Sequence, residues 1–235
     1  METKKILSRL DNWDQKIILK YNGIGGNPIT IILKILSFFG KETIWMFLMV
    51  FYLFILYDPL LFSYITSIFL FGVVIIVPIK KIVDRERPFE SLKDIKVLER
   101  KPTSRSFPSW HAYNVVSQGL LLTYLLNSML IAVLVIIFAA IVSFSRIQLG
   151  VHYPSDVIFG FIIGFIGFIL AITIVSPMLM RLISFFELIT EREIHYQIIN
   201  PLLLENIFYI ILVLALTIVI VILAIHKRIK EVLKK

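Results

Sequence analysis

Residues 145–156, SRIQLGVHYPSD, combine three side chains of complementary chemistry in an otherwise apolar part of the chain. Arg146 offers a fixed fork of N–H donors that suits an anionic oxygen group. His152 can act as a nucleophile or as a proton carrier near neutral pH. Asp156 follows four residues later, close enough in sequence to accept from one ring nitrogen and hold the other in its reactive tautomer. Taken alone, the stretch could equally be a polar loop between two membrane helices.

Two earlier polar stretches carry groups of the same kind. Lys80 precedes Arg87 by seven residues, about two helical turns, so both can face one anion. Ser109 can donate a hydroxyl at a helix start, where backbone N–H groups favour an anion, and His111 can protonate a leaving oxygen. Each stretch also has a simpler interpretation. The first could be a basic cluster at the end of a membrane helix, and the second a serine cap beside an interfacial histidine.

The composition places these groups in a membrane protein. Of the 235 residues 58% are apolar, and the mean hydropathy is +0.89, far above the balance of a soluble domain. The net charge of +8 favours anionic lipid or an anionic substrate as partner rather than nucleic acid, because the apolar runs are so long. No cysteine is present, which excludes disulfides, thiolate metal sites and a cysteine nucleophile. Charges interrupt the N-terminal segment, so no cleaved signal peptide is expected.

The first 40 residues are predicted to form interfacial helices. Apolar residues recur at helical spacing through residues 1–21, with lysine and arginine among them, which is typical of an amphipathic helix on the membrane surface. The glycine-rich residues 22–27 predict a flexible turn. Asn27 and Pro28 then predict an N-cap with proline at the first helical position. The helix that follows should end near Gly40, too short to span a bilayer.

Six membrane spans are predicted after this segment, so the fold class is an all-α, polytopic membrane helix bundle. Residues 112–145 form an uncharged run that is too long for one span, and it should fold back at Asn127-Ser128. The glycines of the fifth span form a small-residue ridge that lets another helix approach closely. The predicted spans are about residues 42–57, 60–79, 112–126, 129–145, 157–175 and 207–225, with that ridge at Gly160, Gly164 and Gly167.

The span order has a geometric consequence for the three polar stretches. With antiparallel neighbours, the end of the second span, the start of the third and the loop between the fourth and fifth lie on one face of the membrane. The scattered polar residues can therefore meet at one site, and ionisable groups at membrane level are costly and usually functional.

The order and spacing of these residues resemble the three-part signature of the type 2 phosphatidic acid phosphatase (PAP2) family, which also occurs in vanadium haloperoxidases. The resemblance covers roughly residues 40–175. It divides the chain into interfacial helices (1–40), a catalytic bundle (41–175), an interfacial segment (176–205), and a final span with a basic tail (206–235). The matching motifs are Lys80-x6-Arg87-Pro88, Pro108-Ser109-x-His111 and Ser145-Arg146-x5-His152-x3-Asp156.

The resemblance implies a role for each motif residue. His152 would attack phosphorus and become a phosphohistidine, while Asp156 would orient it and stabilise its positive charge. His111 would protonate the leaving oxygen and later activate water. The spreading negative charge needs cationic groups and donors more than a metal, so no metal and no cofactor are expected. The groups that would hold the phosphoryl oxygens are Lys80, Arg87, Ser109 and Arg146.

The sequence departs from the family pattern at one position of the second motif. Trp110 occupies a position where the family usually has glycine; it could cap the pocket, contact a lipid chain, narrow the substrate range or change the activity. Arg105 is a further candidate for a phosphate or headgroup contact, although a solvated loop charge explains it as well.

The predicted function is a membrane-embedded, metal-independent lipid phosphatase. Candidate substrates are phosphatidate, phosphatidylglycerophosphate and isoprenyl phosphates or diphosphates. A lipid phosphotransferase using the same intermediate and a non-catalytic binder of anionic lipid are the alternatives.

Two features favour opposite membrane faces for the site. The family usually places its site outside the cytoplasm, and the cell membrane is the expected location. Of the 24 Lys and Arg, however, only Arg181 and Arg192 are expected opposite the motifs, so the positive-inside rule favours a cytoplasmic site.

Overall fold

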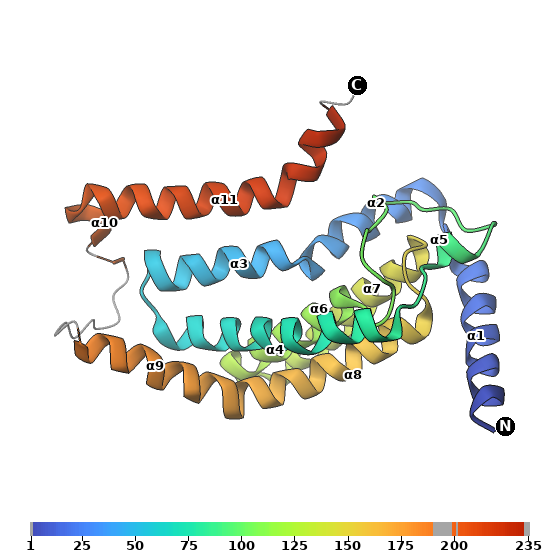
Figure 1. Cartoon of the computed structure of the whole chain (residues 1–235), viewed down its shortest axis with the longest axis horizontal. Coiled ribbons are helices and arrows are strands. Elements are labelled where there is room, and N and C mark those ends of the chain that lie inside the picture. The colour runs from blue at the N-terminus through green and yellow to red at the C-terminus, as the bar shows by residue number, and fades with distance from the viewer. Residues whose placement is uncertain (1, 190–198, 201, 233–235) are drawn as a thin grey trace. The chain divides into compact units, whose positions relative to one another are not determined.

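The computed structural model describes residues 2–189, 199–200 and 202–232, and this part of the chain is helical, with no strand (Figure 1). The predicted all-α fold class is confirmed for these residues. A 3-10 turn, Phe38–Gly40, follows α2, and π-helical turns follow α3 (Phe51–Ile55) and α8 (Ala171–Val175). The helices are α1 (Glu2–Tyr21), α2 (Gly26–Ser37), α3 (Glu42–Val50), α4 (Pro59–Val83), α5 (Pro88–Ser91), α6 (Trp110–Leu126), α7 (Met129–Gln148), α8 (Pro154–Leu170), α9 (Ser176–Ile189), α10 (Leu202–Glu205) and α11 (Ile207–Val232).

The chain forms two compact units. The first comprises Met1–Lys41 and Leu70–Ile169, and the second comprises Glu42–Phe69 and Leu170–Lys235. Every candidate site residue from the sequence belongs to the first unit. In the second unit α3 lies beside α11, and the Tyr57 hydroxyl donates to Glu187 Oε1 at 2.6 Å.

Within the described part of the chain, three helices are long and apolar enough to cross a membrane: Pro59–Ser91, Met129–Gln148 and Pro154–Ile189. A fourth crossing is possible if Ser8–Tyr21 and Gly26–Gly40, which are bent by 117° to each other, form one broken span. The chain is thus a helical membrane protein, but the predicted six spans are not confirmed among the described residues.

Length and polarity explain this difference. The helical segment Glu42–Ile55 is apolar but short. The side chains of α11 are described only over the apolar stretch Ile207–Leu223, so the sixth predicted span is not tested over its whole length. Helix α6 has 17 residues and buries three polar side chains, Asn114, Ser117 and Gln118. The fifth predicted span was expected to end at residue 175, yet the helix continues to Ile189. The rest of the predicted interfacial segment, residues 190–198 with Arg192, lies outside the described residues.

The glycine ridge of α8 is confirmed as a close approach to α6. A Cβ added at Gly160 would lie 2.5 Å from the carbonyl oxygen of Ser109, and one at Gly164 would lie 2.9 Å from that of Tyr113. The predicted fold-back at Asn127 is confirmed too: this residue ends α6 with a positive φ of 44°, in the left-handed region. Helices α6, α7 and α8 therefore stand side by side (Figure 1), with Val115, Val116, Ala139 and Val142 in their core.

The amphipathic helix predicted at the N-terminus is present as α1, which buries Asp14 and Ile18 completely. The turn after it uses glycines with positive φ, including Gly25 at 80°. The prediction of Asn27 as an N-cap is wrong. Gly25 is the N-cap and α2 already begins at Gly26, since glycine adopts the left-handed conformation that this tight turn needs.

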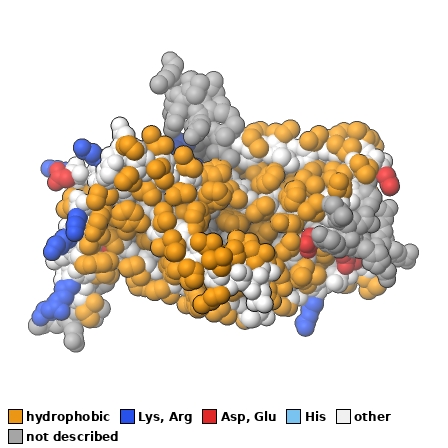
Figure 2. All heavy atoms as spheres, turned by 180° about the vertical axis from the view of Figure 1, so that it is seen from behind, with side chains coloured by type: hydrophobic (Ala, Val, Ile, Leu, Met, Phe, Trp, Pro, Cys, Tyr) orange, Lys and Arg blue, Asp and Glu red, His pale blue; other side chains and the backbone are white. Residues whose placement is uncertain are grey.

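The surface agrees with a lipid environment. Hydrophobic side chains cover most of the face seen in Figure 2, whereas Lys and Arg gather mainly at the edge where α1 lies. Apolar residues of α7 and α8 with about half of their surface exposed include Ile136, Ile137, Ile158 and Phe165. Apolar area on this scale is favourable against hydrocarbon and costly in water.

Candidate functional site

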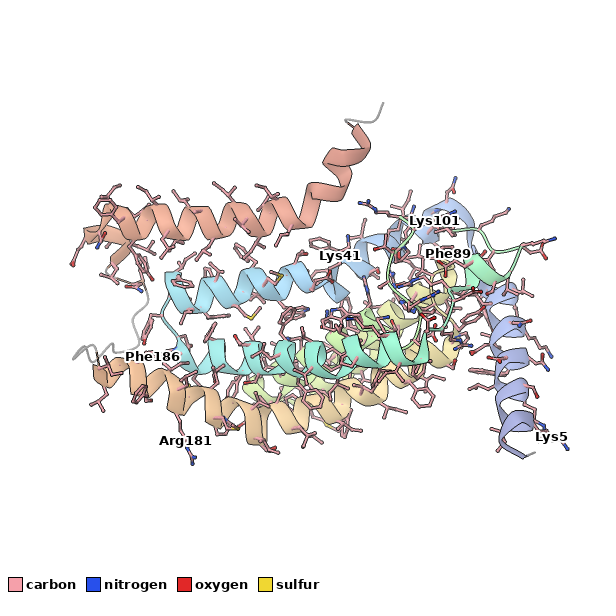
Figure 3. The ribbon with its side chains drawn as sticks, in the orientation of Figure 1. Lys5, Lys41, Phe89, Lys101, Arg181 and Phe186 are labelled. Carbon is pink, nitrogen blue, oxygen red and sulfur yellow. The ribbon has the colours of Figure 1, made fainter. Side chains whose placement is uncertain are left out.

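The structure brings all seven predicted site residues to one end of the first unit. Nitrogen-tipped side chains gather where α4, α5, α7 and α8 meet (Figure 3). The loop between α5 and α6 covers this end, and its Lys101 lies over the ring of Phe89 at 5.7 Å from the centroid. The seven residues come from the end of α4 (Lys80), the residue before α5 (Arg87), the start of α6 (Ser109, His111), the last turn of α7 (Arg146), and the turn into α8 with its first residues (His152, Asp156).

Local turn chemistry delivers His152 to this position. Gly150 has φ +77°, which ends α7 in a conformation that favours glycine, and a Cβ there would lie 2.6 Å from the carbonyl oxygen of Lys96. The backbone N–H of His152 then donates to the Arg146 carbonyl at 3.2 Å. Asp156 sits in the first turn of α8, where the helix dipole favours a negative charge.

His152 and Asp156 are both buried, and their contacts define a tautomer. His152 Nδ1 lies 3.5 Å from Asp156 Oδ2, and His152 Nε2 lies 3.2 Å from Nη1 of Arg87. A guanidinium can only donate, so Nε2 must be the accepting nitrogen and the proton belongs on Nδ1, facing the carboxylate. The lone pair on Nε2 is the one that a nucleophilic histidine needs.

The charge state of His152 agrees with this arrangement. Burial lowers the pKa of His152 well below its ordinary value of 6.5, and the positive charges of Arg87, Lys80 and Arg146 act in the same direction. The imidazole is therefore neutral at pH 7, the form in which it can attack.

Asp156 is the centre of a hydrogen-bond network. Its Oδ2 accepts from the Ser106 hydroxyl at 2.5 Å and from the Tyr153 N–H at 2.9 Å. Its Oδ1 accepts from Arg85 at 2.8 Å, and its backbone carbonyl accepts from the Ser109 N–H at 2.9 Å. Because these bonds come from several segments of the chain, they fix the carboxylate relative to His152.

Two of the predicted phosphate-binding cations are held by backbone carbonyls. Lys80 Nζ donates to the carbonyls of Arg105 at 2.7 Å and Ser106 at 3.2 Å. Arg87 donates to the carbonyls of Ser104 at 2.6 Å and Val151 at 2.7 Å. Both side chains are buried, and their carbonyl partners are neutral, so these contacts do not cancel the positive charge that attracts an anion.

Arg146 is paired with a carboxylate that the sequence analysis did not select. It donates through both terminal nitrogens to the two oxygens of Glu99, one contact being 3.1 Å, and to the Ser37 hydroxyl at 2.6 Å. A phosphoryl group would use the same fork of donors. Glu99 thus occupies the position at Arg146 that the resemblance assigns to the substrate.

We expect Glu99→Gln to lower the KM for a lipid phosphate roughly threefold to tenfold, equivalent to about 0.7–1.4 kcal/mol, because the substrate then displaces a neutral group. Steady-state kinetics at fixed ionic strength would measure this. The matched control is Glu86→Gln, which removes the same charge from an exposed residue. A rise in KM for Glu99→Gln would show instead that the carboxylate holds Arg146 ready for the substrate.

Ser109 and His111 begin α6. The Ser109 hydroxyl accepts from the Ala112 N–H at 3.4 Å as the helix cap and keeps its own proton for donation. The Ser109 N–H, by contrast, is occupied by the Asp156 carbonyl and cannot serve an anion. Gly40 lies against the His111 ring: an added Cβ would be 2.8 Å from Cδ2 and 2.9 Å from Cβ of the histidine.

We therefore expect Gly40→Ala to lower kcat about tenfold or more, since the methyl group must push His111 aside and small displacements of a catalytic group are costly. Gly119→Ala is the matched control, because its Cβ would meet Val135 at 2.5 Å, away from the predicted site residues. Both variants should lose stability, but only Gly40→Ala should lose activity per folded molecule. Equal kcat values for the two would contradict a role of this contact in placing His111.

The two accessory candidates lie in different surroundings. The ring of Trp110 is half-buried and lies 5.9 Å from that of Tyr113. The guanidinium of Arg105 pairs with Asp84 at 2.5 Å in an exposed position, while its carbonyl accepts from Lys80. Their proposed contacts with a lipid stay predictions.

Sequence reasoning missed Asp14, Arg85, Glu99, Ser106 and Gly40. A signal existed for Asp14, which lies four residues before Ile18 on the buried face of an otherwise amphipathic helix. Arg85 lies between Lys80 and Arg87, and Ser106 lies two residues before Pro108, but nothing in their spacing distinguishes them from a solvated charge and a solvated hydroxyl.

The chain belongs to the PAP2 superfamily, whose sequence profile matches residues 59–180. It is 33% identical over 149 residues to an undecaprenyl-diphosphatase of Sulfolobus acidocaldarius, covering 63% of this chain and 70% of that protein. It is 42% identical over 84 residues to a decaprenylphosphoryl-5-phosphoribose phosphatase of Mycolicibacterium smegmatis, covering 36% of this chain and 43% of that one.

The fold is similar to that of a protein of known structure. The crystal structure of Aquifex aeolicus LpxE superposes with a TM-score of 0.58 at 24% identity, covering 67% of this chain and 93% of that one. The family resemblance seen in the motifs is thus confirmed, and the chain is an enzyme of the PAP2 phosphatase family.

Proposed function

We propose that the chain is a metal-independent phosphatase that removes phosphate from a polyisoprenyl phosphate or diphosphate through a phosphohistidine. The arrangement that carries this proposal is His152 with Asp156 at Nδ1 and Arg87 at Nε2. The prenyl lipid is supported by the names of the two relatives, an undecaprenyl-diphosphatase and a decaprenylphosphoryl-5-phosphoribose phosphatase. Phosphatidate and phosphatidylglycerophosphate are the competing substrates.

In the first step, Nε2 of His152 forms a bond to phosphorus and the bond from phosphorus to the bridging oxygen breaks. His111, which must enter this step in its protonated form, gives a proton to that oxygen, which leaves as an alcohol or as a lipid monophosphate. Asp156 accepts from the protonated Nδ1 and stabilises the positive charge that develops on the imidazole. Lys80, Arg87 and Arg146 hold the phosphoryl oxygens, where positioning and positive charge provide most of the catalysis.

In the second step, a water molecule attacks phosphorus while His111 takes its proton, as microscopic reversibility requires. The bond from phosphorus to Nε2 breaks, inorganic phosphate leaves, and His152 returns to its neutral form. The three buried cations supply the charge that a metal provides in other phosphatases.

The test is phosphate release from a panel of lipid phosphates in detergent, with a chelator present. We expect release from prenyl phosphates or diphosphates at a rate that the chelator does not change. Loss of activity with chelator would contradict the metal-independent mechanism. A new phosphoester in place of free phosphate would indicate the phosphotransferase, and Trp110→Gly would then be the first variant to make. The membrane face on which the site opens stays a prediction.

A further inference from the structure

Asp14 is a buried charge that lies outside the segment matched by the family. It belongs to α1 and is 0% exposed. Its Oδ1 accepts from the backbone N–H of Ser155 at 2.9 Å, and its Oδ2 accepts from the Ser155 hydroxyl and from Arg85 at 2.7 Å. A carboxylate is costly to bury, so this one must be compensated by what surrounds it.

Arg85 joins this carboxylate to that of Asp156. One terminal nitrogen donates to Asp14, and the other donates to Asp156 Oδ1 at 2.8 Å and to the Ser155 hydroxyl at 2.7 Å. The guanidinium also lies over the ring of Tyr153, at 4.2 Å from the centroid. Bonds to both ends and a ring below hold the plane of Arg85 in one orientation.

The position of Asp156 depends on this orientation. Its Oδ2 receives the donors of Ser106 and Tyr153 and faces Nδ1 of His152, whereas its Oδ1 is held by Arg85. Rotation of the carboxylate away from His152 would break the bond to Arg85. The guanidinium therefore restricts the one torsion that decides whether Oδ2 faces the imidazole.

Charge gives Asp14 a second effect. Arg85 alone would neutralise Asp156 and weaken its ability to stabilise a positive imidazole. With Asp14 bound to the same guanidinium, the three groups together carry one net negative charge. A third carboxylate, Asp11, lies 3.2 Å from Arg85 but is 60% exposed, so water screens its contribution.

We propose that Asp14 and Arg85 are positioning residues for the reaction of His152, which makes the N-terminal helix α1 part of the catalytic apparatus. The inference rests on the proposed phosphohistidine mechanism. Neither residue touches the substrate; both act through Asp156. The competing interpretation is an ion cluster that only attaches α1 to the rest of the unit.

The test compares Asp14→Asn with Asp11→Asn in the full-length protein. Asp14→Asn keeps the size of the side chain and removes its charge. We expect kcat to fall roughly 10–100-fold, the range typical of losing a group that holds a reacting residue in place. KM should change less than about twofold, because phosphate binding uses other residues. Asp11→Asn should lose less than about twofold in kcat, since its ion pair is exposed.

A second readout does not depend on the lipid. Orthovanadate adopts the five-coordinate geometry of a phosphoryl group under attack, so its affinity reports how well His152 is placed. We expect Asp14→Asn to weaken vanadate binding, measured by calorimetry, by about the same factor as kcat. If the variant fails to fold, Arg85→Lys takes its place. It keeps the charge but removes the planar fork in which one nitrogen reaches Asp14 and the other reaches Asp156, so the same loss is expected.

The outcomes separate this inference from the proposed function. In one outcome the native protein binds vanadate, Asp14→Asn binds it more weakly, and the native protein hydrolyses no lipid phosphate. This result would overturn the proposed substrates and keep the positioning role. Normal kcat and vanadate affinity in a folded Asp14→Asn protein with a lowered unfolding temperature would overturn the inference and keep the function. Equal losses of kcat for Asp11→Asn and Asp14→Asn would also overturn the inference, because the loss of any negative charge near Arg85 would then explain both results.

Discussion

Replacing His152 with alanine is expected to lower the turnover of lipid phosphates about 10⁴-fold or more, the scale seen when a nucleophile is removed. Nε2 of the buried His152 is the nitrogen that carries the lone pair, which accepts from Arg87 in this structure, and Asp156 lies beside Nδ1, where it can stabilise the positive charge. Without this atom, phosphate transfer to water must occur in one step. The remaining cations would still bind the substrate, so KM should change far less than kcat.

The decisive measurement is trapping of the intermediate. With a substrate labelled at the transferred phosphate and a quench in alkali, a label that is stable to base and labile to acid should appear on native protein and be absent from His152→Ala. His111→Ala is the informative companion when the substrate has a leaving group that needs no proton. Only the water-activating role of His111 is then lost, and labelled protein should accumulate. Turnover of His152→Ala within tenfold of the native rate would contradict the phosphohistidine mechanism. Label on another residue would show that this other residue is the nucleophile.

Asp156→Asn is expected to lower kcat by roughly 10³–10⁴-fold, as in other histidines whose orienting carboxylate becomes an amide. The asparagine can turn its NH2 group toward Nδ1 of His152. The ring proton would then move to Nε2, where it removes the nucleophilic lone pair and opposes the N–H of Arg87, 3.2 Å away. The substitution also leaves no negative charge to stabilise the imidazolium.

Activity and stability need separate measurement for this variant. Asp156 accepts from Ser106, Tyr153 and Arg85, so part of any loss in unfolding temperature reflects the fold rather than the reaction. Asp94→Asn is the control, because Asp94 is an exposed carboxylate in the loop before α6, and its kcat should stay within about twofold of native. A kcat for folded Asp156→Asn within tenfold of native would mean that this carboxylate does not select the tautomer.

Features that depend on local sequence were predictable. The fold-back at Asn127, the helix start at Ser109, the amphipathic α1 and the glycine ridge of α8 each follow from residues within one or two helical turns of each other. That the three motifs meet at one site was predictable for a related reason. Successive membrane helices run in opposite directions, so the end of one span and the start of the next lie on the same face of the membrane. The number of membrane spans was harder to predict, because a short apolar helix and a membrane span differ in length by only a few residues.

The partners of the site residues came from tertiary contacts between distant segments. Asp14 bonds Ser155 across 141 positions, and Arg85 reaches Asp156 across 71. Glu99 pairs with Arg146, and Gly40 makes room for His111. A buried carboxylate and a solvated one have the same local pattern, because burial and pairing depend on which helices touch. Residue types and spacing were therefore enough to predict the chemistry, whereas the groups that hold those residues in place depend on the packing of α1 and the α5–α6 loop against the bundle.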